Sequence, residues 1–180
     1  MIRNRLAIFL VALASAVVLN GCTNALTSDI NVDSQAAPGL EMTSYKTYTW
    51  LAAAQILNDP DGQWEPRGFD ADAEIQFLID RELRQHGATE VSANPDLLVA
   101  YIAGVDMEAL ELEDDAESDL EMMKSSPQGA LMILLIDANT GKAVWGAVAT
   151  GEVEGRRSEE EARARLDYAV TQMLARLPTA

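Results

Sequence analysis

Cysteine and histidine are nearly absent from this chain of 180 residues, which contains one of each. A single cysteine excludes an intramolecular disulfide. The sequence also lacks a Gly-Lys-Ser/Thr phosphate loop, a Gly-x-Ser-x-Gly elbow, a His-Glu-x-x-His pair and any Cys/His metal-ligand spacing. It therefore predicts a protein that is not an enzyme and has no bound cofactor. Because acidic residues are abundant, an unrecognised hydrolase with paired carboxylates stays open as an alternative.

Basic residues are also scarce, with 13 Lys and Arg against 29 Asp and Glu. Arg3 and Arg5 lie in the first 21 residues, whereas all 29 acids follow Cys22, so the chain from Cys22 onward has 11 basic residues and a formal charge of −18. Such a surface repels nucleic acid, which we therefore exclude as a partner. Hydrophobic residues make up 48% of the chain, enough for one folded domain.

The chain begins with one apolar run, over residues 6–19, preceded by Arg3 and Arg5. At about 1.5 Å per helical residue this run spans only ~21 Å, which is short of the ~30 Å hydrocarbon core of a bilayer. A short apolar run behind a basic start is typical of a secretion signal. We therefore expect residues 1–21 to be a signal peptide.

The signal ends in Leu19-Asn20-Gly21-Cys22, which resembles the lipobox of bacterial lipoproteins, with Asn20 as a departure from the usual small residue. The resemblance implies that Cys22 is lipidated and that the membrane is a partner through this anchor, with residues 22–28 as a short polar tether. Because Thr23 is not an aspartate, it further implies the outer membrane, with the domain on the periplasmic side. The alternative is ordinary secretion with cleavage near Ala25.

The remaining pattern predicts a single α+β domain over residues 29–177. Strands are expected at residues 29–33, 44–50, 95–104, 130–136 and 143–153, and helices at about 70–86 and 158–177. Residues 137–142 supply the turn of a hairpin. Two helices and this set of strands favour a two-layer sandwich, with a mainly antiparallel sheet and both helices packed on one face.

Capping residues set the limits of both expected helices. Asp70 or Asp72 can cap the first helix and Gly87 can follow its end, which places His86 in its last turn. Without identifiable partners, His86 is not expected to be a catalytic base. Ser158 and Glu161 form a capping box at the start of the second helix.

Residues 106–126 are expected to be an acidic insertion. Nine acidic residues and no basic one lie between Asp106 and Glu121, a density that opposes a packed core. Weak divalent-cation binding by residues 106–121, with Met122 and Met123 nearby, is an alternative function of this segment.

The expected strand over residues 130–136 is apolar on both faces. If the helices cover one face, the other needs a cover from within the chain or from a partner protein. We predict an interface on one of these faces. Its candidate residues are Leu131, Ile133, Leu135 and Trp145.

Three segments in this order, residues 45–50 (YKTYTW), 94–101 (NPDLLVAY) and 135–138 running into 144–146 (LIDA, VWG), resemble the bacterial lipoproteins of domain-of-unknown-function family 4136. The likeness covers about residues 29–177. The acidic stretch is an unusual elaboration, and Gly146-Ala147 lacks the basic residue often found after the tryptophan. The resemblance implies no catalytic residues. The expected function is that of a lipid-anchored envelope protein, a non-catalytic binding or scaffolding module with an envelope protein as its partner.

Overall fold

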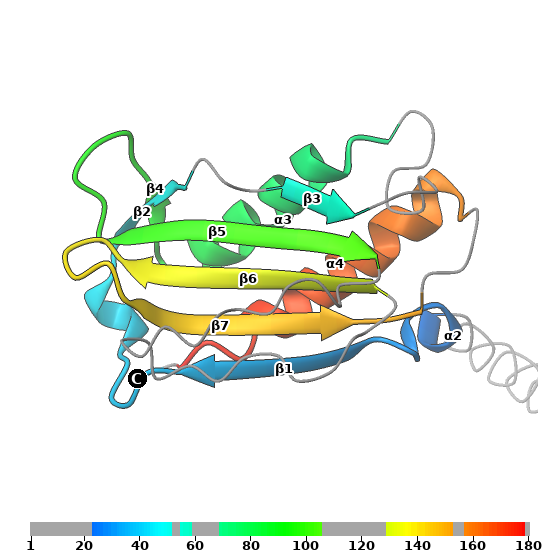
Figure 1. The fold of residues 1–180 in the computed structure, drawn as a ribbon, viewed down its shortest axis with the longest axis horizontal. Coiled ribbons are helices and arrows are strands. Elements are labelled where there is room, and N and C mark those ends of the chain that lie inside the picture. The colour runs from blue at the N-terminus through cyan, green and yellow to red at the C-terminus, as the bar shows by residue number, and fades with distance from the viewer. Residues whose placement is uncertain (1–22, 52–54, 59–68, 106–128, 153–156, 179–180) are drawn as a thin grey trace, which may run out of the picture.

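The structure, a computed structural model, describes residues 23–51, 55–58, 69–105, 129–152 and 157–178. Seven strands form one sheet (Figure 1). Their bounds are β1 (Asn31–Ala36), β2 (Thr47–Trp50), β3 (Gln55–Asn58), β4 (Thr89–Glu90), β5 (Leu97–Val105), β6 (Gly129–Asp137) and β7 (Ala143–Thr150). The helices are α2 (Thr23–Thr27), a 3-10 turn η1 (Met42–Ser44), α3 (Ala71–Gln85) and α4 (Glu159–Leu174). The predicted α+β class is confirmed.

The sheet is mixed, with strand order β1-β7-β6-β5-β2-β4 and β3 paired with β5 beyond the end of β2. The pairs of β1 with β7, β7 with β6 and β6 with β5 are antiparallel. A short turn joins β6 and β7 in a hairpin, whereas β1 and β7 are far apart in the sequence. The pairs β2–β5, β3–β5 and β2–β4 are parallel. The prediction of a mainly antiparallel sheet is therefore wrong. Its physical reason is the chain path, since α3 lies between β2 and β5 and a helical crossover returns the next strand in the same direction.

Strands β3 and β4 are absent from the sequence prediction. Strand β4 has two residues and β3 has four, so neither is long enough to show a clear alternation of polar and apolar residues. Strand β1 begins two residues later than predicted and alternates between exposed and half-buried residues. The tether expected at residues 22–28 contains helix α2 over Thr23–Thr27.

Both long helices begin at the predicted caps. The backbone N–H of Ala73 donates to the Asp70 carboxylate (2.9 Å), and α3 gives way to Gly87 at a φ of 84°, a left-handed conformation that glycine adopts without strain. At α4 the capping box is present, because the N–H of Glu161 donates to the Ser158 hydroxyl and the N–H of Ser158 donates to the Glu161 carboxylate. His86 is the C-cap residue of α3.

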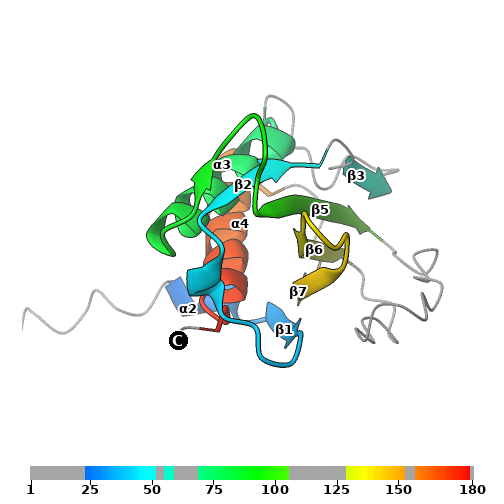
Figure 2. The same ribbon diagram turned by 90° about the vertical axis from the view of Figure 1, so that its left-hand side faces the viewer.

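Helices α3 and α4 lie on the same side of the sheet (Figure 2). Two ion pairs join them, Arg163 with Glu74 at 2.7 Å and Arg81 with Asp167 at 2.5 Å. Between helices and sheet lies the main hydrophobic core. Its fully buried members include Ile75, Ile79 and Leu83 of α3, Val170, Met173 and Leu174 of α4, and Leu97, Val99, Ile133, Leu135 and Trp145 of the sheet.

Candidate functional site

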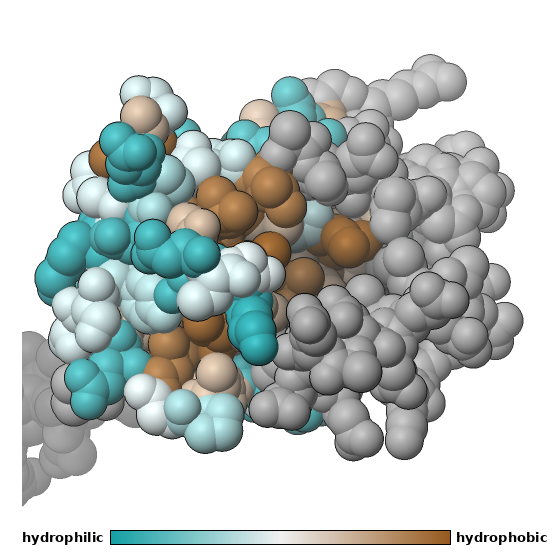
Figure 3. Space-filling view, turned by 60° about the vertical axis from the view of Figure 1, so that its left-hand side comes forward, coloured by the Kyte–Doolittle hydropathy of each residue, from teal (hydrophilic) through white to brown (hydrophobic). Residues whose placement is uncertain are grey.

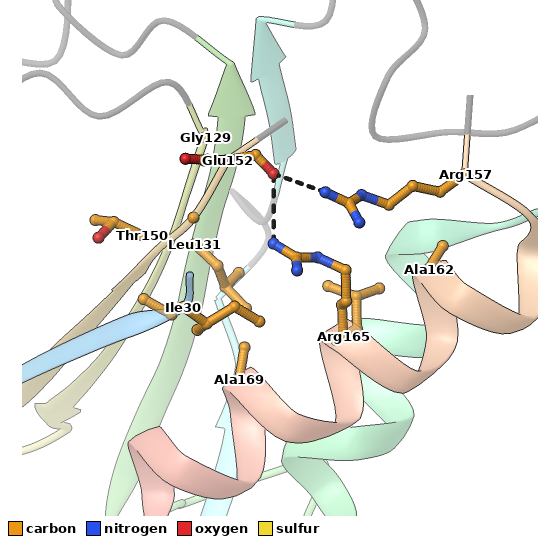
Figure 4. Close-up of a pocket in the computed structure, with 12 residues that line it drawn as sticks. Ile30, Gly129, Leu131, Thr150, Glu152, Arg157, Ala162, Arg165 and Ala169 are labelled. Atoms are coloured by element: carbon orange, nitrogen blue, oxygen red, sulfur yellow. Dashed lines mark hydrogen bonds between the residues drawn. The ribbon is translucent and has the colours of Figure 1, made fainter. Parts of the chain in front are cut away.

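A pocket with a volume of about 90 Å³ lies where α4 passes the end of the sheet (Figure 4). Its walls are mostly apolar. They are formed by Ile30, Leu131 and Ala149 from the sheet side and by Ala162, Leu166 and Ala169 from α4. Arg157, Arg165 and Glu152 supply the polar part of the lining. An apolar cleft with a few placed polar groups is the usual form of a binding site.

Arg165 is held at this pocket by four acceptors. Its guanidinium donates to both carboxylate oxygens of Asp29, at 2.7 and 2.6 Å, in the bidentate geometry that guanidinium and carboxylate groups favour. It also donates to the carbonyl oxygen of Leu26 and, at 3.3 Å, to that of Glu152, the bond drawn in Figure 4. The Arg165 side chain is 12% exposed and that of Asp29 21%. We call this group of contacts the Asp29–Arg165 clamp.

Hydrogen bonds stabilise the charged form of Asp29. The bonds from Arg165 lower the pKa of this carboxyl far below its usual range, against the opposing effect of burial, and the backbone N–H of Glu152 (2.8 Å) lowers it further. Asp29 is therefore ionised at any physiological pH. The clamp is a permanent ion pair, and it ties residues just after α2 to the middle of α4.

Gly151, directly after β7, leaves space for the ion pair of Asp29 with Arg165. A Cβ atom at this position would lie 2.9 Å from Nη2 of Arg165 and 3.3 Å from the Asp29 carboxylate. A side chain here would force the guanidinium to shift relative to its acceptors. The absence of a side chain at Gly151 therefore leaves room for the clamp in its present geometry.

A second polar cluster joins the segments that resemble the family. Asp96, just before β5, accepts hydrogen bonds from the backbone N–H groups of Lys46 (2.8 Å) and Thr47 (2.9 Å) and from the Thr47 hydroxyl (2.9 Å). Asp137, at the end of β6, accepts from the Tyr45 hydroxyl (3.0 Å) and from backbone N–H groups of the following turn. These bonds lower the pKa of both carboxyls, mainly through the N–H of Lys46 at Asp96 and that of Thr140 at Asp137. The cluster stabilises the junction of β2, β5 and β6.

Aromatic side chains attach α3 to the sheet. The Tyr48 hydroxyl (2.7 Å) and the Trp50 indole N–H (3.2 Å) both donate to Asp80, and the Tyr101 hydroxyl donates to Asp72. Burial and the acceptor carboxylates raise the pKa of Tyr48 and of Tyr101. Both phenols are therefore neutral donors, and their contacts hold the helix in place.

The structure places the predicted interface residues in the core. Leu131, Ile133, Leu135 and Trp145 are each at most 1% exposed and belong to the cluster that the helices cover. They cannot form an exposed patch, so the sequence prediction assigns the wrong face of β6. Trp145 Nε1 is buried without a hydrogen-bond partner among the described residues.

The opposite face of β6 is the apolar face that the helices leave uncovered. We call it the outer face, and it includes the half-buried side chains of Leu98, Ile102, Leu134, Ile136 and Val148. Ala100, Ala130 and Met132 on the same face are buried. In a space-filling view, hydrophobic side chains gather at the middle of the surface (Figure 3).

Other predicted features lie outside the described residues, namely Cys22, the leader and the acidic insertion 106–126. Within the described ranges, no group of His, Cys, Asp or Glu residues could hold a metal ion. None of the helices in those ranges combines the length and apolar character needed to cross a bilayer. The sequence alone does not indicate the Asp29–Arg165 clamp, because its two residues are 136 positions apart and no local pattern links them.

Comparison with known proteins identifies a family and a fold. The family model described as "Domain of unknown function (DUF4136)" matches residues 31–179. The structure is similar to a DUF4136 family protein from Bacteroides thetaiotaomicron, with a TM-score of 0.59 at 12% identity over 82% of this chain and 95% of that one. A PelC dodecamer from Paraburkholderia phytofirmans aligns with a TM-score of 0.45 at 15% identity over 82% of this chain and 99% of that one. Comparison with curated proteins gives no match.

Proposed function

The chain belongs to the DUF4136 family, and from this premise we propose that it is a lipid-anchored protein of the cell envelope that binds or scaffolds other envelope components. The lipid is carried by Cys22, and the domain lies on the periplasmic side of the outer membrane. The proposal assumes the two-layer arrangement that the sequence predicts, which is supported by the position of α3 and α4 on one side of the sheet (Figure 2).

The observation that carries the proposal is that α2, whose first described residue follows Cys22 in the chain, is part of the folded domain. Helix α2 (Thr23–Thr27) packs against α4. An acylated Cys22 would therefore be joined to the domain by one peptide bond. This supports anchoring at Cys22 over cleavage near Ala25, which would cut through α2.

The charge states of the described residues favour binding over catalysis. A general acid or base works best when its pKa lies near the working pH. In this domain the pKa of Asp29, Asp96 and Asp137 is lowered and that of Tyr48 and Tyr101 is raised, so these groups are moved away from the working pH. The arginine donors at the pocket are engaged with carboxylate and carbonyl oxygens, an arrangement suited to holding a fixed shape.

Replacing Cys22 tests the anchor. We expect Cys22→Ser to lose incorporation of labelled palmitate and to leave the membrane fraction as a soluble protein, or to accumulate as an uncleaved precursor. Thr23→Ser is the matched control and should fractionate as the wild type. A Cys22→Ser protein that matures and still fractionates with membranes would overturn the lipid anchor and favour ordinary secretion.

A second substitution tests the location. By resemblance to sorted lipoproteins, Thr23→Asp should move the protein from the outer to the inner membrane on a density gradient, while labelling with palmitate persists. If the wild type already bands with the inner membrane, the outer-membrane location is wrong. Proximity labelling in intact cells, with Cys22→Ser as the unanchored control, then tests binding. Enrichment of the same neighbours by both proteins would argue against an anchored scaffold.

A further inference from the structure

Helix α2 lies where the sequence predicts a polar tether, and this changes how the domain can sit on a membrane. The helix has five residues, so it is about 7.5 Å long at ~1.5 Å per residue. An extended chain over residues 23–28 would instead reach about 20 Å. The turn after α2 is closed by the Ser28 hydroxyl donating to Ala25 O (3.2 Å) and by Ile30 N–H donating to Thr27 O (3.1 Å).

The Asp29–Arg165 clamp holds this short connection on the domain. One guanidinium binds the carbonyl of Leu26 within α2, the carboxylate of Asp29 just after it, and the end of β7 through Glu152 O. Because the same guanidinium binds Leu26 within α2 and Asp29 in the turn that follows, α2 cannot move away from α4 without losing the Leu26 bond at a largely buried group. The connection to residue 22 is therefore part of the folded domain.

The clamp also determines which end of the domain is nearest to residue 22. Figure 1 shows α2, the start of α4 and the end of β7 at one end of the sheet, with the turn after β6 at the other. Consecutive Cα atoms are 3.8 Å apart, so the chain beyond the described residues leaves from the end that carries α2 and the pocket.

We propose that the Asp29–Arg165 clamp presses the pocket-bearing end of the domain against the lipid surface and gives the anchored protein one orientation. This inference rests on the proposed lipid anchor at Cys22. The partner of this end is the membrane surface, and the turn at residues 137–142 points away from it. The chain from Cys22 onward carries a charge of −18, which anionic headgroups repel, so the clamp and not electrostatic attraction would hold this end at the surface.

Fluorescence energy transfer to the bilayer measures this orientation. The chain has one cysteine, so in the lipidated protein an introduced cysteine is the only free thiol. Glu160→Cys, exposed in the first turn of α4, reports the pocket end, and Lys142→Cys, exposed in the β6–β7 turn, reports the far end. Full-length lipidated protein is reconstituted into phosphatidylcholine vesicles containing a trace of rhodamine-labelled lipid as the acceptor. We expect clearly higher transfer from position 160 than from position 142.

Breaking the clamp should remove this difference. Asp29→Asn and Arg165→Gln should lower it by about half or more, because a released six-residue segment behaves as a flexible linker. Glu159→Gln is the matched control, since it removes an exposed ion pair with Arg163 (2.9 Å) on the same helix without touching α2. On vesicles with added phosphatidylglycerol at low salt, the clamp variants should move farther from the bilayer than the wild type.

A linker insertion keeps the test valid if a clamp variant fails to fold. Six residues of Gly-Ser inserted after Thr23 leave Asp29 and Arg165 intact but uncouple them from the anchor, so the difference between the two labels should again fall. Equal transfer from both positions in the wild type, or an unchanged difference in the insertion variant, overturns the clamp proposal. Wild-type protein that does not float with the vesicles and lacks the lipid mass overturns the anchor itself.

Discussion

Adjacent residues of β6 should differ sharply in their contribution to stability. Ile133 is 0% exposed and faces the helices, whereas Leu134 is half-buried on the outer face. Removing the buried side chain leaves a cavity in the core, and Ile→Ala or Leu→Ala at such sites costs about 2–5 kcal/mol. We expect Ile133→Ala to lower the free energy of unfolding by about 3 kcal/mol, within that range.

The same truncation at Leu134 removes fewer contacts. Full burial of a leucine is worth about 1.5–3 kcal/mol, so Leu134→Ala should cost about 1 kcal/mol for a half-buried side chain. In a domain of about 150 residues, 1 kcal/mol shifts the melting temperature by roughly 2–4 °C. The melting temperature should therefore fall by about 6–12 °C for Ile133→Ala and by about 2–4 °C for Leu134→Ala.

Urea denaturation and thermal melting of the two variants measure the difference, with equal m-values as the check that the unfolded states match. A harsher pair repeats the test with charge: Ile133→Asp should abolish folding, and Leu134→Asp should leave a folded protein. Equal losses at the two positions would refute the assignment of Ile133 to the core and of Leu134 to the outer face.

Three further predictions concern the clamp and the attachment of α3. Asp29→Asn should be less stable than the wild type at neutral pH, and the gap should narrow as the pH falls below about 4. Because the pKa of Asp29 is lowered in the folded state, the stabilisation by its charge is present above the pKa of the unfolded state and is lost as the pH falls through the pKa of the folded state. A difference in stability between Asp29→Asn and the wild type that stays constant in acid melts would contradict this. Gly151→Ala should lower the free energy of unfolding by about 1–2 kcal/mol. In a double-mutant cycle it should add little to the loss caused by Arg165→Gln, because both changes break the same contacts. Fully additive losses would show that Gly151 and Arg165 act independently. Tyr48→Phe should lower the free energy of unfolding by about 1 kcal/mol, because it removes the hydrogen bond to Asp80. In an ultraviolet titration of the folded wild type, the phenols of Tyr48 and Tyr101 should ionise well above pH 10.0. Ionisation near that value would show that neither phenol is held by its carboxylate.

Elements with strong local signals are predicted well from this sequence. The capping box of Ser158 and Glu161 and the glycine after α3 fix helix limits because these side chains bond to the nearest backbone groups. The β6–β7 hairpin follows from its turn residues, where Asp137 binds the N–H groups of Asn139 and Thr140. Each of these features depends on contacts within a few residues.

The order of elements in the sequence favours the parallel pairing of β2 with β5. A strand, a helix and a strand in that order favour a right-handed crossover and a parallel pair, whatever the strands contain. The antiparallel hairpin that follows β5 hides this signal, because hairpins dominate the C-terminal half of the sheet. The order of elements, more than their composition, determines strand direction here.

The face of β6 that meets the helices could not be read from β6 itself. Both parities of residues 129–137 are apolar, so no alternation marks the buried side. Strand β1 shows which face is buried. Its exposed residue Asp33 pairs with Val148 of β7, and Val148 pairs with Met132 of β6. The polar residues of the edge strand thus mark the outer face, but this inference needs the register of three strands.

The three segments that resemble the family contribute to the fold of this chain through a cluster of hydrogen bonds. Asp96 and Asp137 accept hydrogen bonds from the backbone and side chains of Tyr45, Lys46 and Thr47, and these contacts fix the junction of β2, β5 and β6. The junction lies at the far end of the sheet from α2 and the pocket, as Figure 1 shows for the strand ends involved. In this chain, those three segments therefore fix how the strands join. The Asp29–Arg165 clamp lies at the opposite end of the sheet, and Asp29 precedes the residues 31–179 that the family model matches, so the clamp is separate from the segments that resemble the family.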